Sequence, residues 1–251
     1  MKQKLTVVKV GGAVLEDSAS LAVFLDGFAA IEGAKILIHG GGRTATAMAS
    51  RLGIETRMEG GRRITDAPML EVVTMVYGGL VSRRTVAALQ DRGVNALGLT
   101  GADGGCIKSV KRPVAEIDYG FVGDVESVDG ETFTKLLSSG FTPVVAPLSY
   151  SEADGLLNTN ADTMASCVAV ALAGDYEVEL VFCFEKEGIM SPSGDVIARV
   201  CAGGADSLIA DGTVSGGMIP KLQNAVSAVK GGVASVRITK FDSLTGGTVI
   251  N

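Results

Sequence analysis

Two lysines and one aspartate occupy positions where their charges could take part in catalysis. Lys9 lies inside the apolar run Val7-Val8-Lys9-Val10, where a buried ammonium is costly unless an anion meets it. Lys221 opens a predicted helix just after a glycine pair and a proline. Asp162 ends the stretch Asn158-Thr159-Asn160-Ala161-Asp162, whose alternate side chains would face one site if the chain is extended. The alternatives are surface lysines and a helix cap, and a cap explains only one of the three polar side chains in that stretch.

Glycine-rich turns end the first two predicted strands. Gly11-Gly12 follows Lys9 closely, and Gly40-Gly41-Gly42 stands between His39 and a predicted helix. Glycine leaves backbone N–H groups open to an anion, and a helix N-terminus adds a favourable field. Neither turn has the GxxxxGK[ST] or GxGxxG pattern. A plain tight turn is the alternative for each, but two such turns after neighbouring strands favour phosphate binding.

The arginine and histidine positions indicate what kind of substrate the site could bind. Arg62 and Arg63 follow Gly60-Gly61, and an arginine in such a loop suits bidentate binding of a substrate carboxylate. A solvent-exposed pair is an equally good interpretation of the sequence. His39 is the single histidine, and we interpret it as a hydrogen-bonded structural residue. The predicted chemistry therefore has no histidine base.

Composition limits the class of protein. The chain has 251 residues, 47% of them apolar, and a net charge of −6, which argues against coating nucleic acid or an anionic membrane. No signal-peptide core or membrane-spanning apolar run occurs, so we expect a cytoplasmic protein with no membrane and no nucleic-acid partner. The four cysteines lack CxxC spacing, which favours free thiols over disulfides or a metal site.

Strands and helices alternate along the chain. This rhythm predicts an α/β three-layer sandwich with a central, mainly parallel open sheet, whose ligands lie beyond the carboxyl ends of the strands. We expect an N-terminal lobe over 1–174 and a C-terminal lobe over 175–251, sharing one sheet. The predicted strands are 5–10, 35–39, 94–100, 142–148, 178–184 and 235–239, with a hairpin within 109–128 and helices at 44–52, 70–90, 164–173 and 221–229.

Together these motifs resemble the amino-acid kinase superfamily, and within it the acetylglutamate kinase family. The resemblance covers essentially the whole chain and implies ATP-dependent phosphorylation of the γ-carboxylate of N-acetyl- or N-succinyl-L-glutamate, a step of arginine biosynthesis. The motifs are Lys9-Val10-Gly11-Gly12, His39-Gly40-Gly41-Gly42, Gly61-Arg62-Arg63-Ile64-Thr65, the 158–162 stretch and 217–221, with 101–105 and 120–123 also matching.

The resemblance also implies a role for each site residue. Asp162 would orient the two lysines, which neutralise the transferring phosphoryl group, and Mg²⁺ would travel on the phosphates of ATP rather than in a protein metal site. Arg63, rather than Arg62, would bind the α-carboxylate of the substrate. The implied groups are catalytic Lys9, Lys221 and Asp162, substrate-binding Gly41, Gly42, Arg63 and Asn158, and ATP-binding Gly11, Gly12 and Lys221.

This chemistry agrees with the residues present. A glutamate γ-carboxylate has a pKa of about 4.3 and is ionised at neutral pH, so the reaction needs no base. The anionic acceptor must be held next to the polyanionic phosphates of ATP. The negative charge that spreads over the transferring phosphoryl group must also be stabilised. The alternatives are a related kinase acting on carbamate, aspartate, glutamate or UMP, and a non-catalytic sensor. A sensor could dispense with a lysine or with the aspartate, whereas this chain keeps all three residues.

Two features bear on nucleotide and assembly. Members of the family commonly carry Ser/Thr-Asp-Val-x-Gly near position 180, where this chain reads Phe182-Cys183-Phe184-Glu185-Lys186-Glu187-Gly188, so the contacts to the adenine base stay open. The chain reaches its first strand almost at once, without the N-terminal helix of arginine-inhibited hexameric members. We therefore expect a homodimer that binds a small-molecule substrate, N-acyl-L-glutamate, and is not inhibited by arginine.

Overall fold

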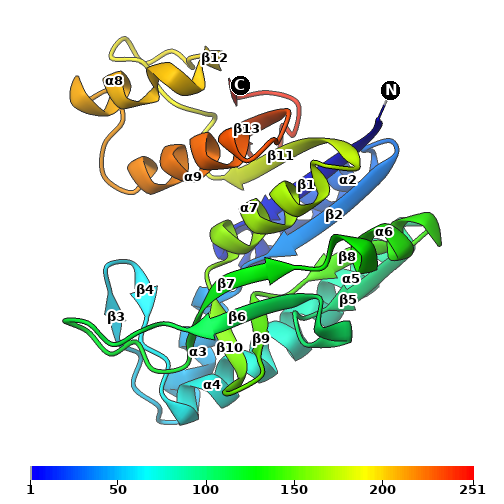
Figure 1. Ribbon diagram of the computed structural model, residues 1–251, viewed down its shortest axis with the longest axis vertical. Helices are drawn as coiled ribbons and strands as arrows, with labels where there is room; N and C mark the ends of the chain where they lie inside the picture. The colour runs from blue at the N-terminus through cyan, green and yellow to red at the C-terminus, as the bar shows by residue number, and fades with distance from the viewer. Residues whose placement is uncertain (1) are drawn as a thin grey trace.

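The computed structural model describes residues 2–251 and is built on a central sheet (Figure 1). The sheet has eight strands in the order β12-β14-β13-β11-β1-β2-β8-β5. β1 (Gln3–Val10) lies in its middle and pairs in parallel with β11 (Tyr176–Phe184) and β2 (Ala34–His39). One pairing in this sheet, between β13 (Ser235–Lys240) and β14 (Thr248–Ile250), is antiparallel. The predicted mainly parallel α/β fold is confirmed.

The predicted strands agree with the structure except at 142–148. β8 (Thr142–Val145) belongs to the large sheet, whereas β9 (Leu148–Ser151) lies in a separate barrel. Pro147 separates them, because proline has no N–H with which to continue a ladder. The remaining strands of the large sheet are β5 (Ala96–Leu99) and β12 (Arg199–Val200).

Helices cover both faces of the sheet. α7 (Ala161–Leu172) and α9 (Met218–Lys230) pack on one face, in front of the strands in Figure 1, against Leu5 and Val7 of β1. The opposite face packs on α2 (Ser18–Ala29) and α5 (Ser82–Gln90). Side chains alternate along a strand, so Lys9 shares the face of Leu5 and Val7 and points toward α7. The sheet therefore directs Lys9 into the helical layer in which α7, the helix that carries Asp162, begins.

A small closed barrel lies beside the sheet and was not predicted. It contains β6 (Ile107–Lys111) and β7 (Val122–Val128), which form the predicted hairpin, together with β9 and β10 (Gly155–Thr159). Its strands are short and partly polar, so they give little periodic signal. The barrel matters for function because β10 ends beside the large sheet and delivers the 158–162 stretch to it.

The remaining elements fill the connections between strands. Residues 67–90 are helical throughout, as α4 (Ala67–Val73), the π-helix η1 (Thr74–Val81) and α5, which confirms the predicted helical segment. α3 (Gly42–Arg51) and α7 begin two and three residues before the predicted starts. The others are α1 (Gly12–Glu16), β3 (Met58–Glu59), β4 (Arg62–Arg63), the short 3₁₀ turns Asp103–Gly105 and Ala202–Gly204, α6 (Gly130–Ser138) and α8 (Ala205–Ala210).

Residues 2–251 contain no helix with the length and apolar character needed to cross a bilayer. Cys106 and Cys183 are buried, Cys167 is half-buried on α7 and Cys201 is exposed, all with free thiols.

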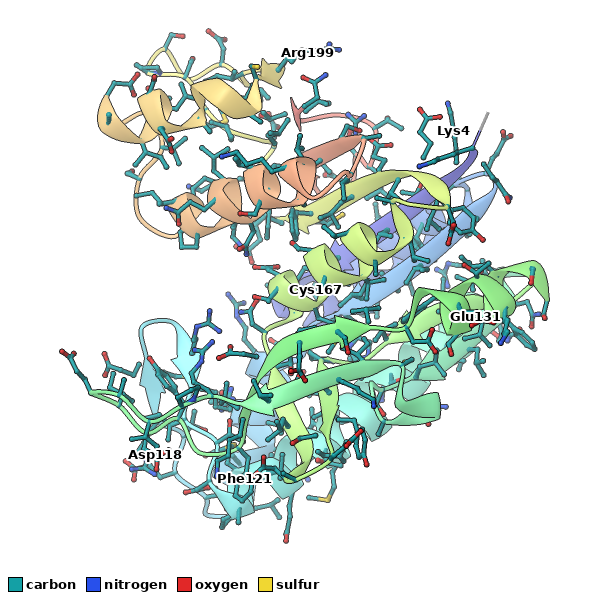
Figure 2. The ribbon with its side chains drawn as sticks, viewed as in Figure 1. Lys4, Asp118, Phe121, Glu131, Cys167 and Arg199 are labelled. Carbon is teal, nitrogen blue, oxygen red and sulfur yellow. The ribbon has the colours of Figure 1, made fainter. Side chains whose placement is uncertain are left out.

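Figure 2 shows Asp118 and Phe121 in the segment that follows β6, next to the β3–β4 hairpin. Tyr119 of this segment contacts the hairpin through its hydroxyl, which donates to Glu59 O at 3.4 Å. Thr65, two residues after the hairpin, pairs with the segment through its backbone, because Thr65 N donates to Tyr119 O and Phe121 N donates to Thr65 O.

His39 makes the stability of the fold depend on pH. Its ring is fully buried, Nδ1 donates to Gly40 O at 2.7 Å, and burial lowers its pKa to about 4. The unfolded chain takes up this proton near pH 6.5, so lowering the pH from about 6.5 to 4 favours the unfolded state. We expect this group alone to remove about 3 kcal/mol of the free energy of unfolding across that window. Urea unfolding midpoints at pH 7.5 and 5 measure the effect.

His39→Asn is the matched variant for this measurement. Its amide can still donate to Gly40 O, but it does not titrate, so the midpoint should fall less between pH 7.5 and 5 than in the parent protein. An equal fall in both proteins would show that groups other than His39 set the acid limb.

Candidate active site

The two glycine turns lie against each other at the carboxyl edge of the sheet. Gly40 N donates to Val10 O at 3.0 Å, which ties the turn after β2 to the end of β1. A Cβ on Gly12 would lie 3.5 Å from the backbone nitrogens of both Gly41 and Gly42. Gly41 also has a φ of +153°, and a Cβ there would lie 2.9 Å from the ring of Tyr77. The turns therefore form one glycine cradle with backbone N–H groups at close range.

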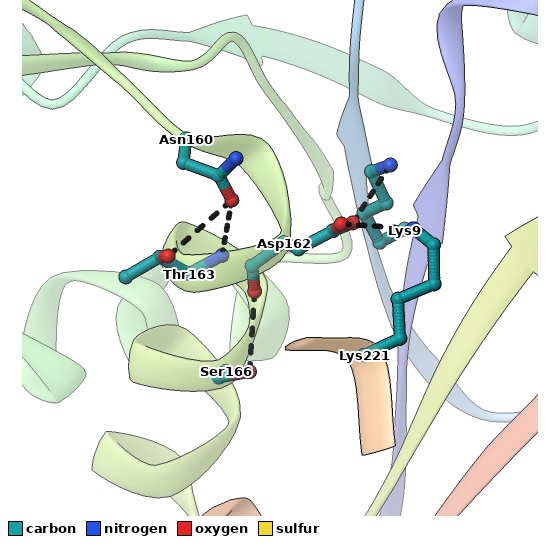
Figure 3. A network of polar contacts seen from close by, with 6 residues as sticks. All are labelled: Lys9, Asn160, Asp162, Thr163, Ser166 and Lys221. Atoms are coloured by element: carbon teal, nitrogen blue, oxygen red, sulfur yellow. Dashed lines mark hydrogen bonds and ion pairs between the residues drawn. The ribbon is translucent and has the colours of Figure 1, made fainter. Parts of the chain in front are cut away.

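Lys9, Asp162 and Lys221 meet in one cluster (Figure 3). Lys9 Nζ lies 2.7 Å from Asp162 Oδ1, a charge contact, and Lys221 Nζ donates to Asp162 Oδ2 at 3.2 Å. Asp162 and Lys221 come from the first turns of α7 and α9, which pack side by side on the face toward which Lys9 points. The side chains of the three residues are 9%, 17% and 25% exposed. The family resemblance implied that Asp162 orients the two lysines, and Asp162 does contact both of them, although their spacing along the chain does not indicate this.

Asn160 explains why Asp162 can reach both lysines. Its side chain caps α7 and accepts a hydrogen bond from Thr163 N at 3.0 Å (Figure 3). The helix cap that stood as an alternative interpretation of this stretch therefore holds for Asn160, and the helix starts at Ala161. Asp162 consequently projects from the helix rather than from extended chain, while Asn158 lies on β10.

Burial and neighbouring charges act on Asp162 and on Lys221 in different ways. Burial works to raise the pKa of Asp162, but the charges of Lys9 and Lys221 outweigh it and hold that pKa below its usual value. Burial lowers the pKa of Lys221, against the attraction of Asp162 and with the repulsion of Lys9. Two ammonium groups and one carboxylate leave a net charge of +1 in the cluster. Such a site attracts phosphate.

A cavity of about 230 Å³ lies on one side of the cradle. Arg63 is 7% exposed at its wall, with Nη2 donating to Gly42 O at 2.7 Å and to Thr46 Oγ1 at 2.8 Å. Among residues 2–251, no carboxylate lies within 4 Å of its guanidinium, so its charge is open to an anionic ligand. The cavity is lined by Lys9, Gly12, Gly40, Gly41, Gly42, Met58, Gly61, Arg62, Arg63, Tyr77, Val122, Pro147, Asn158, Thr159, Asn160 and Ala161.

Asn158 and Arg62 share this small cavity. Asn158 is 9% exposed, and its Nδ2 donates to Thr65 Oγ1 at 2.9 Å, which leaves its carbonyl oxygen and second N–H to the cavity. Arg62 is half-buried, and burial lowers its pKa, with Arg112 adding to the effect. Arg63 is more deeply buried than Arg62. Thr65, which positions Asn158, was missed because a threonine after a glycine-rich loop gives no sequence signal of its own.

A second cavity of about 510 Å³ lies on the other side of Lys9. Its wall includes Phe184, whose ring lies under both lysines, at 3.7 Å from Lys221 Nζ and 5.5 Å from Lys9 Nζ. The sequence marked the 182–188 segment only as a departure from a pattern. The lining is Lys9, Gly11, Gly12, Ala13, Val14, Gly42, Arg43, Phe184, Glu185, Lys186, Ser215, Gly217, Met218 and Lys221.

Lys9, Gly12 and Gly42 line both cavities and mark the place where they meet. Every other site residue inferred from the sequence, except Asp162, lines one of the two: Gly41, Arg63 and Asn158 the smaller, and Gly11 and Lys221 the larger. An anion in the smaller cavity and a phosphate chain in the larger would thus face each other across the glycine cradle and Lys9. This arrangement suits transfer of a group between two bound molecules.

The donor set does not suit a protein-held metal. Within the part of the chain that the structure describes, no three His, Cys, Asp or Glu side chains cluster to bind a cation. Asp162 already has one lysine at each carboxylate oxygen. A divalent ion in this site would take its oxygens from a phosphate ligand and water.

Comparison with known proteins agrees with this geometry. The model of the amino acid kinase family matches residues 4–240. An acetylglutamate kinase of Bacteroides thetaiotaomicron is 54% identical over 242 residues, covering 95% of this chain and 94% of that protein. The structure of smu.665 from Streptococcus mutans superposes with a TM-score of 0.81 at 25% identity, covering 98% of each chain.

A more distant structure shares the fold. Carbamate kinase from Giardia lamblia bound to AMP-PNP superposes with a TM-score of 0.73 at 12% identity, covering 99% of this chain and 98% of that one. The family match spans both cavities and the cluster between them. The chain belongs to the amino acid kinase family.

Proposed function

We propose that the protein transfers the γ-phosphate of ATP to the γ-carboxylate of N-acetyl-L-glutamate. The 54% identity to an acetylglutamate kinase over almost the whole chain supports this acceptor. The structural observation that carries the proposal is the meeting of two cavities at Lys9, Gly12 and Gly42. We assign the smaller cavity to the acyl-glutamate and the larger to ATP. The reaction would belong to arginine biosynthesis in the cytoplasm.

Arg63 and Asn158 would hold the acyl-glutamate. Among the described residues Arg63 has no carboxylate partner, so its positive charge would attract the α-carboxylate, although its Nη1 and Nη2 groups already donate to protein acceptors. Asn158 can add a hydrogen bond from the same wall. The γ-carboxylate would then point toward the glycine cradle, where Gly41 and Gly42 supply backbone N–H groups. Fixing both ends of the substrate aligns one carboxylate oxygen with the phosphorus, and this alignment contributes much of the acceleration.

In the transfer step a carboxylate oxygen attacks the γ-phosphorus. The new O–P bond forms as the bond to the β,γ-bridging oxygen breaks, and ADP leaves with that electron pair. No proton moves, because the carboxylate is already ionised at neutral pH. Lys9, which lines both cavities, would meet the transferring phosphoryl group, and Lys221 the leaving side.

Asp162 would act as an organiser of this step. Its contacts at 2.7 and 3.2 Å fix both ammonium groups before substrates arrive, so little reorganisation is needed during transfer. ATP would enter with Mg²⁺ held by its phosphates and water, and the ion would screen phosphate charge. Gly11 and Gly12 would donate backbone N–H groups to the phosphates from the other wall.

Trapping of the acyl phosphate with hydroxylamine tests the reaction. ATP and N-acetylglutamate, N-succinylglutamate, glutamate or aspartate are supplied in parallel, and hydroxamate and ADP are measured. We expect turnover of N-acetylglutamate, with the succinyl arm reporting how far the acyl pocket extends. Turnover of a free amino acid alone would assign the protein to a related kinase. Binding of ATP without turnover of any acceptor would favour a sensor.

We also propose two lobes and a homodimer. Residues 1–174 would bind the acyl-glutamate and 175–251 the nucleotide, because the smaller cavity is lined entirely from the first range and the larger draws on both. The homodimer is proposed from the family resemblance. Light scattering coupled to size exclusion measures the mass, and a monomer at micromolar concentration would contradict the dimer.

A further inference from the structure

We propose that Phe184 is a positioning residue that holds the ammonium groups of Lys221 and Lys9 on the face of its ring. The inference rests on the proposed phosphoryl transfer and adds to it an aromatic group that holds two cations without neutralising them. Phe184 ends β11, is half-buried and forms part of the wall of the larger cavity.

The geometry places the ring against the cations. Lys221 Nζ lies 3.7 Å from the ring centroid, which is close contact, and Lys9 Nζ lies at 5.5 Å. A lysine ammonium within about 6 Å of an aromatic face is attracted by the negative face of the ring. Phe182, two residues earlier on the same face of β11, stacks on Phe184 with centroids 6.1 Å apart and ring planes 15° from parallel. This stacking fixes the ring.

The ring compensates for hydrogen bonds that the lysine lacks. Among residues 2–251, the hydrogen-bond acceptor of Lys221 Nζ is Asp162 Oδ2 alone, although an ammonium carries three donors. Lys35 is a useful contrast, since it lies 5.4 Å from the ring of Phe28 but donates to two backbone carbonyls, Ala29 O and Ile31 O. The aromatic face therefore contributes more to holding the ammonium of Lys221 than to holding that of Lys35.

An uncharged ring suits this place better than a second carboxylate. A carboxylate at position 184 would bring the cluster of two ammonium groups and Asp162 to a net charge of zero, and repel the phosphates of ATP. The ring stabilises the ammonium groups and leaves their net charge of +1 for the transferring group. Phe184 would thus fix the positions of the two ammonium groups and leave the net charge of the cluster unchanged.

Stepwise fluorination of one ring tests the electrostatic role. Phenylalanine with one, two or three fluorine atoms is placed at position 184 through an amber codon, because fluorine weakens the negative face while almost keeping the shape. We expect kcat for N-acetylglutamate to fall at each step, by about 3- to 30-fold over the series. KM for N-acetylglutamate should stay unchanged, because Phe184 does not line the smaller cavity.

Fluorination at Phe182 is the matched control. That ring is 1% exposed, lies on the same strand and has no cation over its face among the described residues. The same series at Phe182 should leave kcat nearly constant. A flat response at 184, or equal falls at 182 and 184, would overturn the proposal and reduce Phe184 to a packing residue.

A titration without substrates separates this proposal from the proposed function. The ¹³Cε signal of Lys221, assigned with Lys221→Ala, reports its pKa in the ligand-free protein. The charged groups around it are Lys9, Asp162 and, at the cavity rim, Arg43, Glu185 and Lys186. None of these changes along the series, so the pKa of Lys221 should fall as fluorine is added. A constant pKa would overturn the inference even if the enzyme is active, and a falling pKa would support it even if another acceptor is the substrate.

Discussion

Replacing Lys9 or Lys221 by alanine should lower kcat by ~10²-fold or more. Each change removes one ammonium from the place where the γ-phosphoryl group would cross between the two cavities. The loss falls on the transition state, in which phosphoryl charge is spread over more oxygens than in bound ATP. KM for N-acetylglutamate should change much less, because Arg63 and Asn158 remain. Steady-state kinetics with both substrates varied measures the two constants.

Lys35→Ala is the control for loss of a buried lysine. Lys35 is 8% exposed, comparable with Lys9 at 7%, and it too lies over an aromatic ring, but it lines neither cavity. This variant should be less stable and keep its kcat. If kcat is unchanged in both Lys9→Ala and Lys221→Ala, the two ammonium groups do not stabilise the transfer, and the assigned mechanism is wrong.

Replacing Arg63 by alanine should chiefly raise KM for N-acetylglutamate, by about 10- to 100-fold. The guanidinium is buried without a carboxylate partner and would form charge-assisted hydrogen bonds with the α-carboxylate. That carboxylate does not change during the reaction, so the lost interaction is the same in ground and transition states. Initial rates over a wide range of N-acetylglutamate concentrations, at saturating ATP, measure the change.

Two further variants define the role of Arg63. Arg63→Lys keeps the charge but not the planar fork, so it should recover only part of the affinity. Arg62→Ala removes the neighbouring arginine from the same cavity and should have the smaller effect. A larger rise in KM for Arg62→Ala than for Arg63→Ala would transfer the α-carboxylate to Arg62. A selective rise in KM for ATP would instead reassign Arg63 to the nucleotide.

The central fold could be predicted because its signals are local. The runs that became β1, β2 and β11 are continuous and apolar, as expected for strands buried on both faces, and helical patterns between them indicate parallel pairing. The barrel could not be predicted in the same way. β9 and β10 are short, and their positions depend on a closed ladder with β6 and β7, which are distant in sequence.

The local chemistry of the site follows from short segments of the sequence. A lysine in an apolar strand, glycines at two strand ends and a polar stretch before a helix are properties of short segments. Helix capping is equally local, and the cap that stood as an alternative interpretation of that stretch is made by Asn160. The reaction class came from the resemblance to the acetylglutamate kinase family, and the residue types agree with it, since an acceptor that is already ionised needs no base.

Folding brings these groups into contact. Lys9, Asp162 and Lys221 meet because β1 directs one side chain toward the face on which α7 and α9 begin. The division into two cavities that share Lys9, and the ring of Phe184 under two ammonium groups, depend on the same packing. Residue type and spacing act over a few positions, whereas burial, pKa and contact depend on segments that only folding brings together.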